Sequence, residues 1–440
     1  MLLNKLLVNT QNFCAEFYKK SSVLKNIDKL IFITILSLIF ASNFASSDNI
    51  GLFAIFTIVL TIIKLLVKPK EKFVLSVADM SLLVYFIIVL ISVAGSSLFI
   101  LSLKGFSKTL IYIGFYVSLI HFLKDNKRSF LYILLALFLS VLFESLIAIK
   151  QNFLSVAEIS GWQDVSRLNP EEIMTRVYGS IKPYNPNLFG GYMLAILPST
   201  LVAIFLPLKN RHYKTALVAL LCLFLGIGTI FMTGCRGAYL GLFIEVILIL
   251  LLTYKFLKIK YKKIFATIST IISSILFMFI ISISSLRARI FSIFAMRNDS
   301  SNSFRFNVYN SCVEMLKDNW ILGIGVGNQN FREIYGLYMK TGFDALSAYN
   351  IYLEIAVESG IFALVFFMIF IVINIKNAIN YIIKRNNMQT IYLSIAVISI
   401  IGVLVHGLVD TVFFRPQIQF IFWLMISLIT VLTTQRGNYD

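Results

Sequence analysis

The sequence has few charges and few of the residues that build metal or disulfide sites. Only 14% of its 440 residues are charged, whereas a soluble globular chain has about a quarter. Its four cysteines form no CxxC pair, and its three histidines are scattered. We therefore expect no disulfide framework and no metal. No small-residue cleavage site follows the basic N-terminal stretch, so we expect no removable signal peptide.

Apolar residues make up 58% of the chain and include 40 phenylalanines. They form blocks of about 20 residues, the length of helix that crosses a ~30 Å hydrocarbon layer. Backbone groups inside that layer must pair internally, so these blocks predict helices. The two-residue alternation of a membrane barrel is missing. Although the net charge is +18, the basic residues lie in short runs between apolar blocks, so no nucleic-acid partner is expected.

The sequence therefore predicts an all-α, polytopic integral membrane protein with about twelve transmembrane helices in a single membrane domain, 1–440. The predicted spans are 30–47, 51–67, 79–101, 106–123, 129–149, 187–207, 214–233, 238–256, 264–284, 351–375, 390–407 and 416–433.

The basic residues predict the orientation. Alternating from a cytoplasmic N-terminus places 24 of the 39 lysines and arginines inside, with both termini cytoplasmic, in a multi-pass protein of the cell inner (cytoplasmic) membrane. Two long extracytoplasmic loops follow, 150–186 and 285–350, the second between helices 9 and 10, and long loops tend to be functional. In the second loop, Phe304, Val308, Cys312 or Val313 and Leu316 recur at helical spacing, which predicts an amphipathic helix on the membrane surface.

Arginine is concentrated on the predicted outer face. It accounts for nine of the 15 outer basic residues and only four of the 24 inner ones. A guanidinium group binds phosphate or carboxylate through two parallel hydrogen bonds, so this enrichment indicates an anionic, phosphate-bearing ligand. For Arg287, Arg289 and Arg297, contact with lipid phosphates at helix ends is the favoured interpretation.

Arg236 is the strongest candidate for the site. It lies in the tight turn TGCRGAYLG between two apolar blocks, where a charge is costly unless it meets a counter-charge or a ligand. Arg305 lies opposite Phe304 and Val308 on the amphipathic helix. Two further arginines are expected in the same site: Arg176, shortly before the turn Asn185-Pro186-Asn187, and Arg415, just before Pro416.

Other polar residues of the apolar blocks have two interpretations each. Glu354 and Glu358 share a helix face and either pair with the outer arginines or face interfacial water. His406 and Asp410 form either a proton-handling pair or, preferably, a structural hydrogen-bonded pair. Glu144 and Glu245 lie within spans and should be paired internally or face a cavity.

The glycine-rich stretch WILGIGVGN follows no strand and is expected outside the cell, so it does not indicate a dinucleotide site. We expect it to form a turn packed closely under the outer helices. No cofactor is expected.

Several motifs together resemble the O-antigen ligase and polymerase superfamily of membrane proteins. The resemblance covers roughly 175–430. It is carried by RVYGSIKPYNPNLFGGYMLAILP from Arg176, FMTGCRGAYLG, SFRFNVYNSCVEMLKDNWILGIGVGNQNF and YNIYLEIAVESGIFAL.

This resemblance implies a metal-independent glycosyltransferase working outside the cytoplasmic membrane. A saccharide moves from a polyprenyl-pyrophosphate carrier to an acceptor glycan or lipid, with inversion at the anomeric carbon. Arg236 and Arg305 look like the arginines that hold the pyrophosphate and stabilise it as a leaving group. Arg176, Asn187 and Arg415 are expected to bind substrate, with membrane lipids as further partners.

One position departs from the family pattern. The ligases usually carry a histidine before the Asn of an N-x-Y-L-E segment, here Asn350 to Glu354, and this chain has Tyr349 there. Tyr349 would replace the residue that activates the acceptor, although tyrosine, with a pKa near 10, is a poor base at neutral pH. Asn350 and Glu354 are expected to contact substrate.

The departure leaves a second function open. LSAYNIYLEIAVESG and HGLVDTVFFRPQIQFIFWL look like the IctB branch of the superfamily, named for a proposed role in bicarbonate accumulation. The alternative is thus an inorganic-carbon transporter or its accessory protein. The sequence shows no clear repeats and no broken, charge-lined spans, which disfavours transport. The many outer arginines favour the transferase.

Overall fold

The computed structural model describes residues 21–67, 76–153 and 174–434, and the regular structure within these ranges is entirely helical. The α-helices are α2 Ser22–Lys25, α3 Ile27–Ala41, α4 Ser47–Val67, α5 Val77–Gly95, α6 Phe99–Asp125, α7 Ser129–Asn152, α8 Pro186–Ile196, α9 Thr200–Lys209, α10 Tyr213–Met232, α11 Arg236–Phe256, α12 Ile259–Ser282, α13 Ser284–Phe291, α14 Ser300–Asp318, α15 Asn328–Tyr335, α16 Ile351–Lys384, α17 Met388–His406 and α18 Pro416–Thr434. Short 3-10 turns are η2 Leu197–Ser199, η3 Met296–Asn298 and η4 Val412–Phe414. Most of the predicted outer loop 150–186, including Arg167, lies outside the described residues.

Eleven helical segments of the described chain are long and apolar enough to cross a membrane. They match all the predicted spans except the first, and α8 and α9 form one span across η2. The first predicted span, 30–47, is wrong in length. Helix α3 ends at Ala41 after 15 residues, and at about 1.5 Å per residue it is shorter than a ~30 Å hydrocarbon layer. The predicted all-α polytopic membrane protein is confirmed, with eleven candidate spans.

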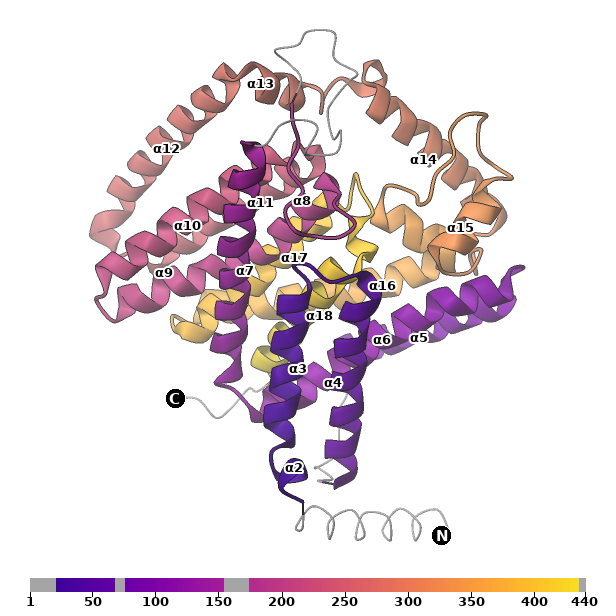
Figure 1. Ribbon diagram of the computed structural model, residues 1–440, viewed down its shortest axis with the longest axis horizontal. Helices are drawn as coiled ribbons and strands as arrows, with labels where there is room; N and C mark the ends of the chain where they lie inside the picture. The colour runs from indigo at the N-terminus through magenta and orange to yellow at the C-terminus, as the bar shows by residue number, and fades with distance from the viewer. Residues whose placement is uncertain (1–20, 68–75, 154–173, 435–440) are drawn as a thin grey trace.

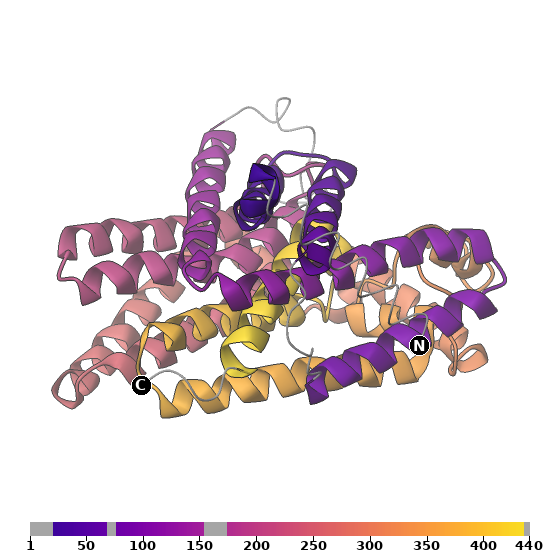
Figure 2. The same ribbon diagram turned by 90° about the horizontal axis from the view of Figure 1, so that it is seen from below.

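The spans differ greatly in how many of their residues are buried inside the protein. Within an apolar 18-residue stretch of each span, 89% of the residues are buried in α8–α9 and in α18 and 72% in α17, so these helices form the centre. No part of the α12 span is buried, and Figure 1 shows α12 at the margin of the molecule, leading into α13. Helices α5 and α16 lie side by side along another edge (Figure 2). The apolar faces of these outer helices match a lipid environment.

The predicted outer loop 285–350 folds into α13, η3, α14 and α15. The predicted amphipathic helix is α14, which buries Val308, Cys312 and Met315. Its apolar face packs against Phe331 and Tyr335 of α15 and against α16, so protein covers this face. Aromatic residues of the same loop thus cover the apolar face of α14, for which the sequence pattern had predicted contact with lipid.

Helix α16 is broken at Gly360, whose φ of +83° is unfavourable for residues with a side chain. The break frees carbonyl groups of α16, and the segment 320–328 binds them. Ile324 N–H donates to Val357 O at 3.0 Å, and Gly325 N–H donates to Glu358 O at 2.9 Å. The predicted turn under the outer helices is confirmed. The expectation that no span is broken is wrong.

Gly105 is required by a close contact between α6 and the segment 320–328. A Cβ on Gly105 of α6 would lie 2.3 Å from the carbonyl oxygen of Val326. Only glycine lets α6 approach the segment 320–328 this closely.

Some of the buried charged side chains within the spans are paired. The ammonium group of Lys64, which is 3% exposed, forms ion pairs with Asp28 and with Asp125, so it joins α3, α4 and α6. Glu144 accepts hydrogen bonds from the Ser180 amide at 2.9 Å and hydroxyl at 2.5 Å, which confirms its predicted internal pairing. Glu245 lies fully buried against Gly402, and its carboxyl oxygens have no hydrogen-bond partner within the described chain.

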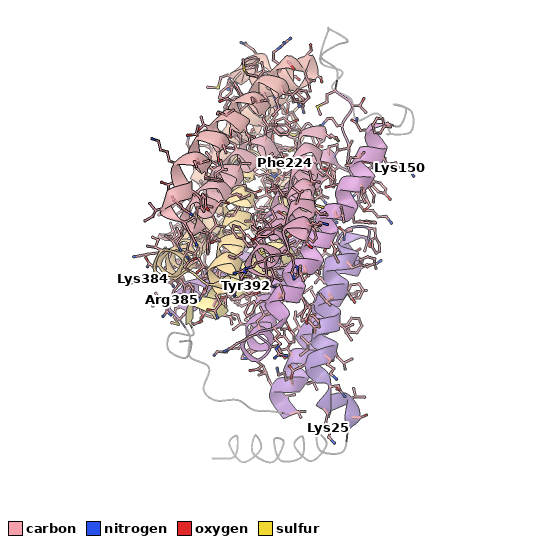
Figure 3. All side chains as sticks on the ribbon, turned by 90° about the vertical axis from the view of Figure 1, so that its left-hand side faces the viewer. Lys25, Lys150, Phe224, Lys384, Arg385 and Tyr392 are labelled. Atoms are coloured by element: carbon pink, nitrogen blue, oxygen red, sulfur yellow. The ribbon has the colours of Figure 1, made fainter. Side chains whose placement is uncertain are left out.

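Basic residues assigned to opposite membrane faces are well separated. In Figure 3, Lys150 lies toward the upper end of the molecule and Lys25 at its lower end. Lys384 and Arg385, which the alternation assigns to the same side as Lys25, lie below Lys150. Lys255 joins the ends of two helices there, because its ammonium group donates to the carbonyl oxygen of Arg385 at 2.6 Å.

Candidate active site: a cavity lined by four arginines

A cavity of about 180 Å³ lies where α8, α11, α13 and α14 meet. Four arginines line it, each from a different segment of the chain: Arg176 before α8, Arg236 at the start of α11, Arg289 in α13 and Arg305 in α14. Guanidinium groups that are far apart in sequence are thus gathered around one space. The cavity also has Asn187, Ser301 and Asn302 in its wall, so its polar lining is rich in hydrogen-bond donors.

Arg236 is held in place by a carboxylate. It is only 7% exposed, and its Nη1 lies 2.8 Å from Asp299 Oδ1 and 3.1 Å from Ser292 Oγ. Asp299 also caps α14, since it accepts a hydrogen bond from the Asn302 amide at 3.0 Å. Asp299, 63 residues after Arg236 in the sequence, therefore supplies the counter-charge that a buried arginine requires. The ion pair also holds α11 against α14.

Asp299 remains ionised at neutral pH. Burial alone would raise the pKa of its carboxyl, but the hydrogen bonds from Arg236 and from the Asn302 amide outweigh burial. The pKa of Asp299 therefore lies below its ordinary value of 3.8. The ion pair with Arg236 is therefore present at neutral pH.

A second chain of contacts links Arg176 to Arg305. Arg176 donates from Nε to Thr233 O at 2.8 Å and from Nη2 to Asn187 Oδ1 at 2.5 Å. Asn187 in turn donates to Asp410 Oδ2 at 3.1 Å, and the same oxygen lies 3.6 Å from Nη2 of Arg305. Asp410 thus fixes two sides of the cavity at once.

Arg305 has a guanidinium N–H group that makes no hydrogen bond within the described chain. Its Nη1 donates to Ser301 Oγ at 3.1 Å, while its buried Nε has no hydrogen-bond partner within the described chain. An unmade hydrogen bond on a buried donor is costly unless something else satisfies it. Four arginines line the cavity, and the carboxylates of Asp299 and Asp410 are paired with Arg236 and Arg305.

Tyr349 lies beside this group and outside the cavity lining. Arg305 Cζ lies 5.7 Å from the centre of its ring, and Phe304 meets the ring edge-on at 5.8 Å. Burial, followed by the nearby charge of Asp410, raises the pKa of Tyr349 above its usual 10, against the opposing effect of Arg305. Tyr349 is therefore neutral at physiological pH and supports Arg305 with its ring face.

Three of the predicted site residues lie elsewhere. Asn350 caps α16, accepting from the amides of Tyr352 and Leu353, and donates to Leu408 O at 2.9 Å. Glu354 is buried, accepts from the Ala348 amide at 3.0 Å and does not line the arginine cavity. Arg415 is exposed before α18 and does not line the cavity.

His406 and Asp410 do not form the expected hydrogen-bonded pair within the described chain. His406 Nε2 lies 3.5 Å from the Cys235 sulfur, and Asp410 binds Asn187 and the amides of Thr411 and Val412. His406 thus contacts the turn before α11, and Asp410 contacts α8. The prediction that His406 and Asp410 form a hydrogen-bonded pair is wrong.

The sequence analysis did not predict Arg289 and Asp299 as residues of the site. Arg289, which was expected to reach lipid phosphates, lines the cavity and donates from Nε to Gly234 O at 2.7 Å. Two signals point to these residues in retrospect. Arg289 lies five residues beyond the predicted span 264–284, and Asp299 stands alone before a helix, where an acidic cap is favoured.

Residues 221–368, about a third of the chain, match the protein-family model described as O-antigen ligase, Wzy_C. The matched segment contains Arg236, Arg289 and Arg305, whereas Arg176 and Asp410 lie outside it. No curated protein matches the chain. Over the segment that supplies three of the four cavity arginines, the protein is therefore similar to the O-antigen ligases.

Proposed function

We propose that this protein is an O-antigen ligase- or polymerase-like membrane glycosyltransferase. It moves a saccharide from a polyprenyl-pyrophosphate carrier to an acceptor glycan or lipid. The observation that carries the proposal is the convergence of Arg176, Arg236, Arg289 and Arg305 on one cavity. A pyrophosphate joined to a lipid and a sugar carries two negative charges, and guanidinium groups suit it because each can bind phosphate oxygens through two parallel hydrogen bonds.

The reaction needs charge stabilisation at the leaving group. The oxygen of the acceptor hydroxyl forms a bond to the anomeric carbon, the bond from that carbon to the pyrophosphate breaks, and the anomeric configuration inverts. The electron pair of the broken bond stays on the pyrophosphate, which gains a negative charge and takes up the proton of the acceptor hydroxyl. Preorganised donors aimed at that developing charge lower the barrier most when water is excluded.

The contacts around the cavity assign roles to its residues. Arg236 is fixed by Asp299 and presents its remaining donors to the pyrophosphate. Arg305, whose Nε is unpaired in the described structure, binds the same group from the opposite helix. Arg176 and Asn187 position Asp410, which orients Arg305. Tyr349 supports Arg305 and is not the base, because it stays protonated.

We place the cavity on the extracytoplasmic side of the inner membrane, with both termini in the cytoplasm. The support is the lysine-rich composition of the short connections at the other end and the arginine-rich composition of the segments around the cavity. A lipid carrier is then presented to the cavity from the outer leaflet.

The inorganic-carbon transporter remains a second candidate because of the break in α16. Transporters use broken helices to bind ions with freed backbone groups. Here the segment 320–328 occupies the carbonyls of Val357 and Glu358. The break is filled by protein, which favours the transferase.

The test is a gene deletion complemented with variants, read as the surface glycan profile on a gel. Arg236→Lys keeps the charge but loses the two-bond grip, so it should fail to restore the glycan. Arg287→Lys is the matched control, since Arg287 is exposed and does not line the cavity. A normal profile with Arg236→Lys contradicts the proposal. Unchanged glycans with lowered carbon uptake in the deletion support the transporter.

A further inference from the structure

A second cavity, of about 310 Å³, lies between α5, α6, α16, α18 and the segment 320–328. Among the described residues it shares no lining residue with the arginine cavity. We propose that this second cavity binds the acceptor, as an anionic saccharide that carries a phosphate or carboxylate group. The inference rests on the proposed function and names the second substrate's site.

Two lysines supply the attraction for an anion. Lys104 and Lys108 stand four residues apart on one face of α6, and both line the cavity. They lie within a candidate membrane span, where a positive charge is costly unless it faces a water-filled cavity or meets a negative group. No ion pair to either ammonium group is formed within the described ranges, although Glu358 is close enough to attract Lys108. An anionic ligand would satisfy both lysines.

Two carboxylates in the same wall suit sugar hydroxyl groups. Glu354 and Glu358 lie one helical turn apart on α16, and both are buried. Glu354 Oε2 accepts from the Ala348 amide at 3.0 Å, and Glu358 Oε1 accepts from the Gly327 amide at 2.8 Å. Each carboxylate has a second oxygen and further lone pairs, which can accept from hydroxyl donors.

Aromatic rings complete the lining. Trp423, Tyr112 and Phe413 contribute flat apolar surfaces that fit the C–H faces of a sugar ring. The Trp423 indole is fixed, because its Nε1 donates to Gln419 Oε1 at 2.7 Å. A phospholipid headgroup would use the lysines but would leave the remaining carboxylate lone pairs and the ring faces unused. A charged saccharide uses all three sets.

The segment 347–349 places this cavity next to the arginine cavity. Ser347 Oγ bonds to Thr411 Oγ1 at 2.6 Å, Ala348 binds Glu354, and Tyr349 packs under Arg305. One short segment therefore touches the wall of both cavities. An acceptor held by Glu354 would extend its hydroxyl past this segment toward the donor.

The test is binding of a defined probe, measured through Trp423 fluorescence in nanodiscs of zwitterionic lipid. Glucose 6-phosphate, which combines a sugar ring with a phosphate, is the probe. It should change the fluorescence of the wild type and leave that of Trp423→Phe unchanged. The double variant Lys104→Gln/Lys108→Gln should raise the Kd at least ~10-fold, since two charge-assisted contacts are lost. Lys317→Gln/Lys340→Gln, two exposed lysines of the outer segment, should bind as the wild type does.

Three results would overturn the inference. These are no Trp423-dependent response, a response that survives the loss of Lys104 and Lys108, and a response to phosphatidylglycerol but not to the sugar phosphate. Arg236→Lys should keep the response, and its loss would place the probe in the arginine cavity instead. Because binding is measured without a donor, a chain that binds the probe but transfers no sugar refutes only the proposed function.

Discussion

Arg236 and Asp299 form an ion pair at 2.8 Å between the start of α11 and the cap of α14. The pair joins the central bundle to the outer segment that carries Arg289 and Arg305. It is nearly buried, with side chains 8% and 11% exposed, so it orients Arg236 more firmly than a surface pair would. The position of Arg236 thus depends on one carboxylate.

Replacing Asp299 with Asn should lower the transfer rate by about 100-fold, because a displacement of a catalytic group by about 1 Å has an effect of that size. The measurement is transfer in proteoliposomes that contain a polyprenyl-pyrophosphate-linked saccharide. Asp318→Asn is the control, since Asp318 is exposed and binds only Tyr338 in the described structure. An unchanged rate with Asp299→Asn would show that Arg236 needs no such restraint.

The stability of the protein should depend on pH through Asp299. Its folded pKa is lowered, so its contribution is fully present above the unfolded value near 3.8 and is lost as pH falls through the lower folded value. Thermal unfolding in detergent should show a fall in Tm below pH 4 that is smaller in Asp299→Asn. Identical acid profiles of the two proteins would mean that the ion pair contributes nothing to stability.

Asn187 and Asp410 should act as one unit, because they bind each other and link Arg176 to Arg305. Asn187→Ala and Asp410→Asn should each slow transfer, and the double variant should be little worse than the slower single variant. A double-mutant cycle on the transfer rate measures this. Strict additivity of the two effects would argue against a connected network.

Tyr349 should contribute through its ring and not through its hydroxyl. Tyr349→Phe keeps the ring under Arg305, so the rate should stay within about 3-fold of the wild type, whereas Tyr349→Ala should lose much more. Because the pKa of Tyr349 is raised above 10, its ionisation should not shape the rate profile between pH 6 and 8. A large loss in Tyr349→Phe would restore a chemical role for the hydroxyl.

Two helical glycines offer a matched test of the packing beneath the second cavity. Gly51→Ala has open space for its Cβ and should be neutral or stabilise by up to ~1 kcal/mol, from helix propensity. Gly105→Ala has the same propensity gain, but its Cβ meets the Val326 carbonyl at 2.3 Å and should lower Tm by several degrees. Equal Tm values for the two variants would mean that α6 can move away from the segment 320–328 at little cost.

The apolar blocks predicted the helices well, because each block is about as long as a membrane-spanning helix. They could not say which apolar faces meet protein and which meet lipid, since both environments select the same side chains. For this reason α14 was assigned to a membrane surface, although it packs on Tyr335. The first span was overextended because Ser42 and Asn43, whose side chains bond back to α3 carbonyls, end that helix early.

The candidate site was predictable only in part, for a similar reason. Arg236 was indicated by its place in a tight turn between apolar blocks with no acidic neighbour in sequence. Arg176 and Arg305 were indicated by the enrichment of arginine on the predicted outer face. The partners that orient them, Asp299 and Asp410, come from segments whose approach depends on the three-dimensional packing. Glu354 and Asn350 have the right residue types, but backbone amides already occupy part of their hydrogen-bonding capacity.

The most direct test of the arginine cavity is the affinity of the purified protein for polyprenyl pyrophosphate and for polyprenyl monophosphate. The wild type should prefer the pyrophosphate by about 10-fold or more, because additional charge-assisted hydrogen bonds form. Arg236→Lys and Arg305→Lys should lose that preference while binding the monophosphate nearly as well. Equal affinities of the wild type for the two lipids would contradict a cavity built for a diphosphate.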